Sequence, residues 1–83
     1  MRVLYFAWVR ERAGRAAEDV APSAGVTTVS DLADFLAQLS PGHAAAFADR
    51  TRLRVAVNQE QAGFDSPVAA NDEVAFFPPM TGG

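Results

Sequence analysis

The groups with the clearest capacity for chemistry lie in the last ten residues. The stretch 74–83 contains no charged side chain, passes through Pro78-Pro79 and ends in Thr81-Gly82-Gly83. Prolines hold a backbone extended, and glycines without Cβ atoms enter narrow active sites, so this end is suited to presenting the Gly83 carboxylate to another enzyme. Fully extended, the segment 78–83 would reach roughly 20 Å. The alternative is a frayed and inert terminus, because final residues are commonly disordered.

Elsewhere the residue types that usually perform catalysis are scarce. The chain has no Cys, which excludes a cysteine nucleophile, a disulfide framework and a thiolate metal site. His43 is the only His, and a lone His is a poor metal-ligand candidate. Asp31 and Asp34 lie three residues apart, as expected of the solvated face of a helix. We therefore expect no bound metal or cofactor, and a chain that enters a reaction as the carrier of a group.

Composition narrows the class of protein and its partners further. Eighty-three residues, of which 49% are hydrophobic, fit one domain over 1–83. The net charge of −3 argues against nucleic acid and anionic membranes as partners. The apolar run Val3–Val9 is too short for a membrane span and lacks a signal cleavage site, so we expect a cytoplasmic chain. All seven basic residues are Arg, and Arg50, Arg52 and Arg54 alternate as if along one strand face, either toward an acidic partner or for solubility.

The elements that must position the C-terminal end follow from local pattern. We predict a first strand over Val3–Val9, a turn over 10–15 punctuated by Gly14, and a weaker strand over 16–21 that pairs with the first. A helix capped by Thr28 presents Leu32, Phe35, Leu36 and Leu39 on one face and ends at Ser40-Pro41-Gly42; a short helical turn over 44–48 brings Phe47 to the core. The remaining expectations are a strand over 54–58, a polar turn over 59–63, a short strand at Phe64 and a last strand over 73–77.

This order predicts an α+β domain. One main helix would pack across one face of a mixed sheet of about five strands, with the first and last strands as central neighbours. That is the pattern of a β-grasp, or ubiquitin-like, fold, from which 78–83 would leave as an extended, flexible C-terminal tail.

Aromatic residues indicate a docking surface beside that tail. Strand alternation places Phe76 in the core and Phe77 outside; on the first strand, Tyr5 would point inward while Phe6 and Trp8 point outward. Large apolar side chains exposed near a functional end are typical of a protein interface. The alternative is that one of them only covers a sheet edge.

Throughout its length, the chain resembles the small, sulfur-carrier subunit of molybdopterin synthase. The residues that carry the resemblance are Val3 to Ala7, Val9-Arg10-Glu11, Gly14, Val57-Asn58-Gln59, Phe64-Asp65, Pro67, Asp72 to Pro79, and Thr81-Gly82-Gly83. Gln61 departs from the family, in which an apolar residue often stands at that position.

The resemblance implies a mechanism in which Gly83 is the reacting residue. An adenylyltransferase similar to ubiquitin-activating enzymes would use ATP to adenylate the Gly83 carboxylate, and a sulfur donor would convert it to a thiocarboxylate. The large synthase subunit, which is expected to hold the catalytic residues and to form a heterotetramer with the small one, would then pass the sulfur to cyclic pyranopterin monophosphate. The implied clearance residues are Gly82 and Thr81, and the implied docking residues are Phe6, Phe77, Pro78, Pro79 and Met80.

Three other functions remain open. A sulfur carrier of thiamine synthesis has the same fold and a diglycine end. A ubiquitin-like modifier would join the same end to protein lysines. A purely structural binding domain would carry its diglycine incidentally.

Overall fold

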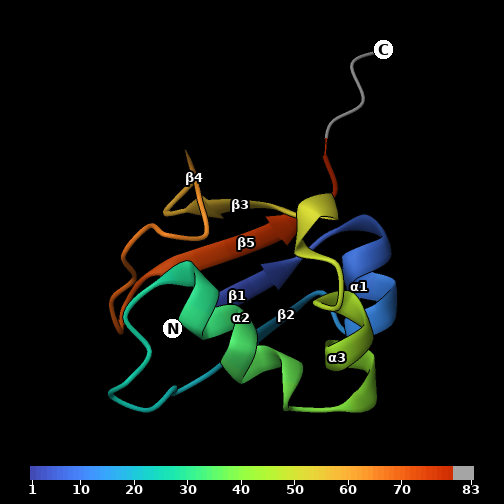
Figure 1. The fold of residues 1–83 in the computed structure, drawn as a ribbon, viewed down its shortest axis with the longest axis horizontal. Helices are drawn as coiled ribbons and strands as arrows, with labels where there is room; N and C mark the ends of the chain where they lie inside the picture. Colours follow the sequence, from blue (N-terminus) through green and yellow to red (C-terminus); the bar gives the residue numbers. More distant parts are fainter. Residues whose placement is uncertain (80–83) are drawn as a thin grey trace.

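The computed structural model of the chain describes residues 1–79, which fold around a five-stranded mixed sheet (Figure 1). The strands are β1 (Arg2–Tyr5), β2 (Ala17–Asp19), β3 (Arg54–Val57), β4 (Glu60–Ala62) and β5 (Glu73–Phe77). Their order in the sheet is β2-β1-β5-β3-β4; β1 and β5 are parallel, and the other neighbours are antiparallel. The predicted pairing of the first and last strands at the centre of the sheet is confirmed.

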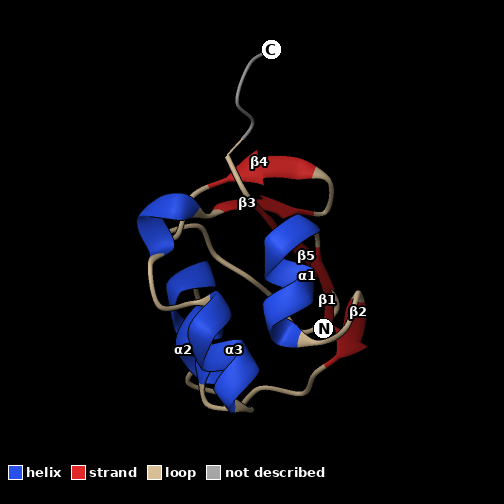
Figure 2. Cartoon of the chain, turned by 90° about the vertical axis from the view of Figure 1, so that its right-hand side faces the viewer, coloured by secondary structure: helices blue, strands red, loops and turns tan. Residues whose placement is uncertain are grey.

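Helices cover one face of this sheet (Figure 2). They are α1 (Ala7–Ala13), α2 (Val29–Ala37), α3 (Pro41–Ala46) and the 3-10 helix η1 (Arg50–Arg52). Val3, Val55 and Val74 from the strands join Leu32 and Leu36 of α2 in one buried cluster. Within residues 1–79 no helix is long and apolar enough to cross a bilayer.

The N-terminal prediction was wrong after Tyr5. The run Val3–Val9 was expected to be one strand and 10–15 a turn, but β1 stops at Tyr5 and α1 follows. Val9 and Ala13, four positions apart, both face the core, and the helix closes at Gly14, whose φ of 83° suits only glycine well. The β propensity of the aromatic run hid this helical spacing, so the single main helix of the prediction is one of three.

The region 28–47 agrees more closely with its pattern. The Thr28 side chain accepts a hydrogen bond from the Asp31 backbone, and the Asp31 side chain accepts one from the Thr28 backbone, which completes a capping box at the start of α2. Leu39 lies beyond the end of this helix and is 43% exposed. Ser40-Pro41-Gly42 was expected only to end a helix, yet Ser40 also caps α3, because its side chain accepts a hydrogen bond from the His43 backbone N–H. Pro41 is compatible with the first helical turn. Phe47 is buried as predicted.

The predicted polar turn over 59–63 is also corrected. Asn58 and Gln59 have φ values of 52° and 70°, the positive angles of a two-residue hairpin turn, so the strand β4 begins at Glu60. Phe64 lies on no strand: β4 ends at Ala62, and beyond Phe64 there is only an isolated bridge between Thr28 and Pro67 before β5.

Candidate functional site

The candidate site is the end of β5, where the chain leaves the middle of the sheet. We call Phe77, Pro78 and Pro79 the strand exit; all three are partly buried. Met80, Thr81, Gly82 and Gly83, which were predicted as docking, clearance and reacting residues, lie outside the described residues.

Pairing on both sides fixes the strand exit. Tyr5 is opposite Phe76 in the parallel pair, and Arg54 is opposite Phe77 in the antiparallel pair. The backbone N–H of Phe6 donates to the carbonyl of Phe76 at 3.1 Å. Phe76 is fully buried, and its ring meets that of Phe47 edge to face at a centroid distance of 4.9 Å. The residues that follow β5 therefore start from a rigid position.

The two predicted docking aromatics lie at this same end. Tyr5 and Phe76 are opposite one another in the parallel pair of β1 and β5. Phe6 and Phe77, the next residues, therefore lie at the same end of these two neighbouring strands. Phe6 is 49% exposed, the most exposed large apolar side chain described, whereas Phe77 is partly covered. Phe6 is exposed as the sequence predicted, but it precedes α1 as its N-cap and does not continue a strand. The role of Phe6 and Phe77 in docking stays a prediction.

Sequence reasoning missed the rest of the apolar surface beside them. Leu4, Ala56 and Ala75 alternate with buried residues on three adjacent strands, so they face away from the helices. Ala56 pairs with Ala75 on one side and with the exposed Gln61 on the other. The period-two pattern of these strands was the signal that could have found this outer face. The side chains at the centre of this outer face are small, because Ala56 and Ala75 occupy its middle positions.

A buried polar network was missed as well. Glu18 accepts hydrogen bonds from the Tyr5 hydroxyl and from His43 Nε2, each at 2.7 Å, and it lies 3.4 Å from Arg15. A carboxylate only accepts, so His43 Nε2 carries a hydrogen, and His43 Nδ1 is hydrogen-bonded to the Ser40 hydroxyl at 2.7 Å. Ser40 in turn accepts from the His43 backbone at 3.1 Å. The network links β1, β2 and α3.

Burial and hydrogen bonding set the ionisation of this network. Burial works to raise the pKa of Glu18, but hydrogen bonds from His43 and Tyr5 outweigh it and leave that pKa below its ordinary value. Burial, helped by the hydrogen bond to Glu18, raises the pKa of Tyr5. Glu18 is therefore a carboxylate and Tyr5 a neutral donor near neutral pH. All four side chains satisfy one another inside the fold, which suits a structural role.

The arginines are arranged differently from the prediction. Arg50 and Arg52 belong to η1, and only Arg54 is on a strand, so the three do not line one strand face. Trp8, expected to point outward from a strand, lies half-buried on α1 with the guanidinium carbon of Arg12 4.5 Å from the centroid of its ring.

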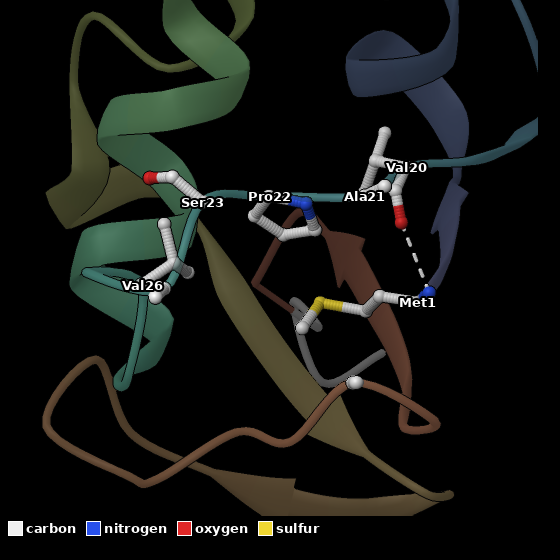
Figure 3. Close-up of a pocket in the computed structure, with 8 residues that line it drawn as sticks. Met1, Val20, Ala21, Pro22, Ser23 and Val26 are labelled. Atoms are coloured by element: carbon white, nitrogen blue, oxygen red, sulfur yellow. Dashed lines mark hydrogen bonds between the residues drawn. The ribbon is translucent and has the colours of Figure 1, made fainter.

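No metal centre is formed by residues 1–79: they place no three His, Cys, Asp or Glu side chains together. A cavity of about 310 Å³ lies at the start of β1, where the Met1 amine donates to the Val20 carbonyl at 3.0 Å (Figure 3). Because β1 and β5 are parallel, this cavity is at the opposite end of the central strands from the strand exit. Its lining holds no charged side chain: Met1, Val20, Ala21, Pro22, Ser23, Ala24, Val26 and Ala70.

Parallel central strands, helices on one face, and a last strand that leads out of the middle of the sheet define a ubiquitin-like protein of the β-grasp class. The chain belongs to the ThiS family, whose model matches residues 3–83.

Relatives and solved structures agree with that membership. The chain is 47% identical over 83 residues, 100% of this chain and 99% of the relative, to the molybdopterin synthase sulfur carrier subunit of Escherichia coli (strain K12). The protein of the same name from Haemophilus influenzae is 36% identical with the same coverage. The crystal structure of H. volcanii small archaeal modifier protein 1 is similar with a TM-score of 0.73 and 31% identity, covering 96% of this chain and 97% of that one.

Proposed function

We propose that this chain is a sulfur carrier in molybdopterin biosynthesis. The observation that carries the proposal is its 47% identity, over almost the whole of both chains, to a relative named as the sulfur carrier subunit of molybdopterin synthase. The Thr81-Gly82-Gly83 end and the absence of Cys favour the same chemistry, since sulfur would be carried on the backbone.

The proposed reaction centre is the carboxylate of Gly83. A carboxylate is a poor electrophile; attack of its oxygen on the α-phosphorus of ATP would release pyrophosphate and leave an acyl adenylate. A sulfur nucleophile would then attack the carbonyl carbon and expel AMP, which gives the thiocarboxylate. Gly82 and Thr81 would give backbone clearance in both active sites.

The folded part of the chain would position the C-terminal segment that ends in Gly83. The hydrogen bonds and aromatic contacts of β5 support a role in which a rigid domain presents 78–83 to its partners. Exposed Phe6 and the adjacent Phe77 are the apolar groups that we expect to dock, with Pro78, Pro79 and Met80 continuing the contact.

Two protein partners are proposed. The large subunit of molybdopterin synthase would bind the small one, in a heterotetramer, and provide the catalytic residues for sulfur transfer to cyclic pyranopterin monophosphate. An adenylyltransferase similar to ubiquitin-activating enzymes would charge Gly83 and would be the partner that binds ATP, so the carrier itself needs no bound cofactor. Because charging consumes ATP, we place this chemistry in the cytoplasm.

Mass spectrometry of the intact chain tests the proposal. Incubation with the activating enzyme, ATP and a sulfur source should replace one oxygen of Gly83 by sulfur, and adding the large subunit with the pyranopterin precursor should return the carboxylate and yield molybdopterin. A thiocarboxylate that forms but is consumed only in thiazole synthesis would instead assign the chain to thiamine synthesis.

A second candidate function is protein modification. It is favoured by the similarity to a small archaeal modifier protein, which shares the fold at 31% identity. This chain has no Lys, so copies of it cannot form side-chain-linked polymers with one another. Conjugates to other proteins that depend on Gly83 and appear without a sulfur source would support this reading.

A further inference from the structure

The arginines divide into two groups according to their ion pairs. Three of the seven bind carboxylates: Arg2 binds Asp19, Arg15 binds Glu18, and Arg50 binds Asp34. Among residues 1–79 the other four have no carboxylate within 4.0 Å: Arg10, Arg12, Arg52 and Arg54. A chain with a net charge of −3 therefore keeps four positive charges without an acidic partner in its described part.

Two of these four charges share one aromatic ring. The guanidinium carbon of Arg12 lies 4.5 Å from the centroid of Trp8, and that of Arg52 lies 5.8 Å from it. We call these three residues the arginine–tryptophan cluster. Cation–π attraction to the indole holds each guanidinium, but the two like charges repel one another. A carboxylate bound to either guanidinium would reduce that repulsion.

The cluster lies at the same end of the molecule as the strand exit. Arg52 ends η1 two residues before Arg54, and Arg54 pairs with Phe77. Trp8 lies two residues after Phe6, whose backbone is hydrogen-bonded to Phe76. Figure 1 shows η1, in yellow, beside the end of β5, with α1 next to it. A protein that receives the C-terminal segment would therefore lie close to the cluster.

The chemistry of the cluster selects carboxylates. A guanidinium binds a carboxylate through two parallel N–H···O bonds, and Arg and Trp are enriched among residues that dominate protein interfaces. A positive patch on an otherwise acidic protein also steers an acidic partner during approach. Arg12 and Arg52 are exposed, and half-buried Trp8 holds them in place. One nitrogen of the Arg12 guanidinium also donates to the Ala45 carbonyl at 3.5 Å, which leaves its other N–H groups for a carboxylate.

We propose that the arginine–tryptophan cluster is a second docking contact, which binds Asp or Glu side chains on the large synthase subunit when that subunit receives the C-terminal segment. This inference rests on the proposed function and adds an electrostatic contact to the apolar one formed by Phe6 and Phe77.

The test measures binding of the full-length carrier to the purified large subunit at low and high salt. The Arg12→Gln/Arg52→Gln variant should bind about tenfold more weakly at low salt, mainly through slower association, and its affinity should depend less on salt than that of the wild type. The matched control is Arg2→Gln/Arg50→Gln, which changes net charge equally but removes arginines already bound to carboxylates. It should change affinity by less than about threefold. Thermal melts would establish that both variants are folded.

The outcomes separate this inference from the proposed function. Equal weakening by both double variants would mean that net charge alone matters. Wild-type affinity in the Arg12/Arg52 variant would mean that the cluster only joins η1 to α1. Each result overturns the inference and leaves the sulfur-carrier role standing. Weakened binding to the activating enzyme, with unchanged binding to the large subunit, would also overturn it, because the occupant would be a different protein. If the wild-type chain does not bind the large subunit at all, the proposed function fails and this inference fails with it.

Discussion

Replacing Glu18 by Ala should destabilise the fold far more than an acidic-to-Ala change usually does. The Glu18 side chain is 11% exposed and His43 is 5% exposed, so the pair is largely shielded from water. Removing the carboxylate leaves two buried donors without an acceptor, the Tyr5 hydroxyl and His43 Nε2–H.

The expected magnitude follows from those two donors. Each unsatisfied buried group costs about 1–3 kcal/mol. The two donors together place the loss of unfolding free energy near ~4 kcal/mol, which for a domain of this size lowers the melting temperature by roughly 15–30 °C.

Asp19, the next residue along the same strand, gives the control. Its ion pair with Arg2 is 3.4 Å long and the two side chains are 77% and 55% exposed. Asp19→Ala should therefore cost less than about 1 kcal/mol. Urea unfolding followed by circular dichroism measures both variants, with Glu18→Gln as a milder substitution if the Ala variant is partly unfolded in buffer.

Tyr5→Phe gives a second test of the hydrogen bonds to Glu18. Tyr5→Phe in the wild type removes a hydrogen bond to a carboxylate and should cost about 1.5–3 kcal/mol. In the Glu18→Ala background the same change removes an unpartnered hydroxyl, so it should be neutral or stabilising. Additive losses, or a Glu18→Ala variant as stable as Asp19→Ala, would refute the idea that this network stabilises the fold.

Three further perturbations test other parts of the structure. Acid titration should reveal the contribution of Glu18 to stability. Its pKa is lowered in the folded state, so its stabilisation is present above the unfolded pKa and is lost as the pH falls through the folded pKa. The difference in unfolding free energy between wild type and Glu18→Gln should shrink in that range, and a difference independent of pH would exclude this linkage. Gly42→Ala should cost about 1–3 kcal/mol in urea unfolding, because a Cβ at this position would overlap the Arg12 carbonyl oxygen, and an unchanged midpoint would show that α1 and α3 separate freely. Phe77→Asp should weaken binding to the large subunit while deletion of Gly83 abolishes sulfur transfer, and neither should lower the melting temperature by more than about 5 °C; a larger drop would mean that these residues support the fold.

The parts of the fold that the sequence predicted correctly are those specified by local pattern. The strand predicted over 73–77 after the Asn71-Asp72 turn matches β5 in its bounds, and the capping pair of Thr28 and Asp31 located the start of α2. The strand and helix signals of 3–13 overlap, because Val3 and Tyr5 alternate while Val9 and Ala13 recur four apart. Gly14 was the residue that could have decided between them, since a glycine just after a run with basic residues in its last turn is typical of a helix end.

The buried network could not be predicted because it depends on contacts between distant residues. Glu18 and His43 are 25 positions apart. The sequence around each suggests nothing unusual, because Glu18 is a charged residue on a weak strand and His43 is a lone His after a Pro-Gly pair. Only the pairing of β1 with β2, together with the packing of α3 against α1, brings them together. The cluster of Trp8, Arg12 and Arg52 escaped for the same reason, since Trp8 and Arg52 lie on different elements.

The two faces of β5 separate anchoring in the core from the docking that we propose. In β5, Phe76 points into the core while the next residue, Phe77, belongs to the outer face, so a one-residue slip of register would exchange them. The slip is opposed on both sides of the strand, because Tyr5 is held by Glu18 in one neighbour and Val55 is buried in the other. The polar network that holds Tyr5, the last residue of β1, thus helps to determine which aromatic residue lies on the outer face at the strand exit. A substitution that weakens the network but leaves the outer face unchanged should therefore weaken docking only if the register of β5 shifts.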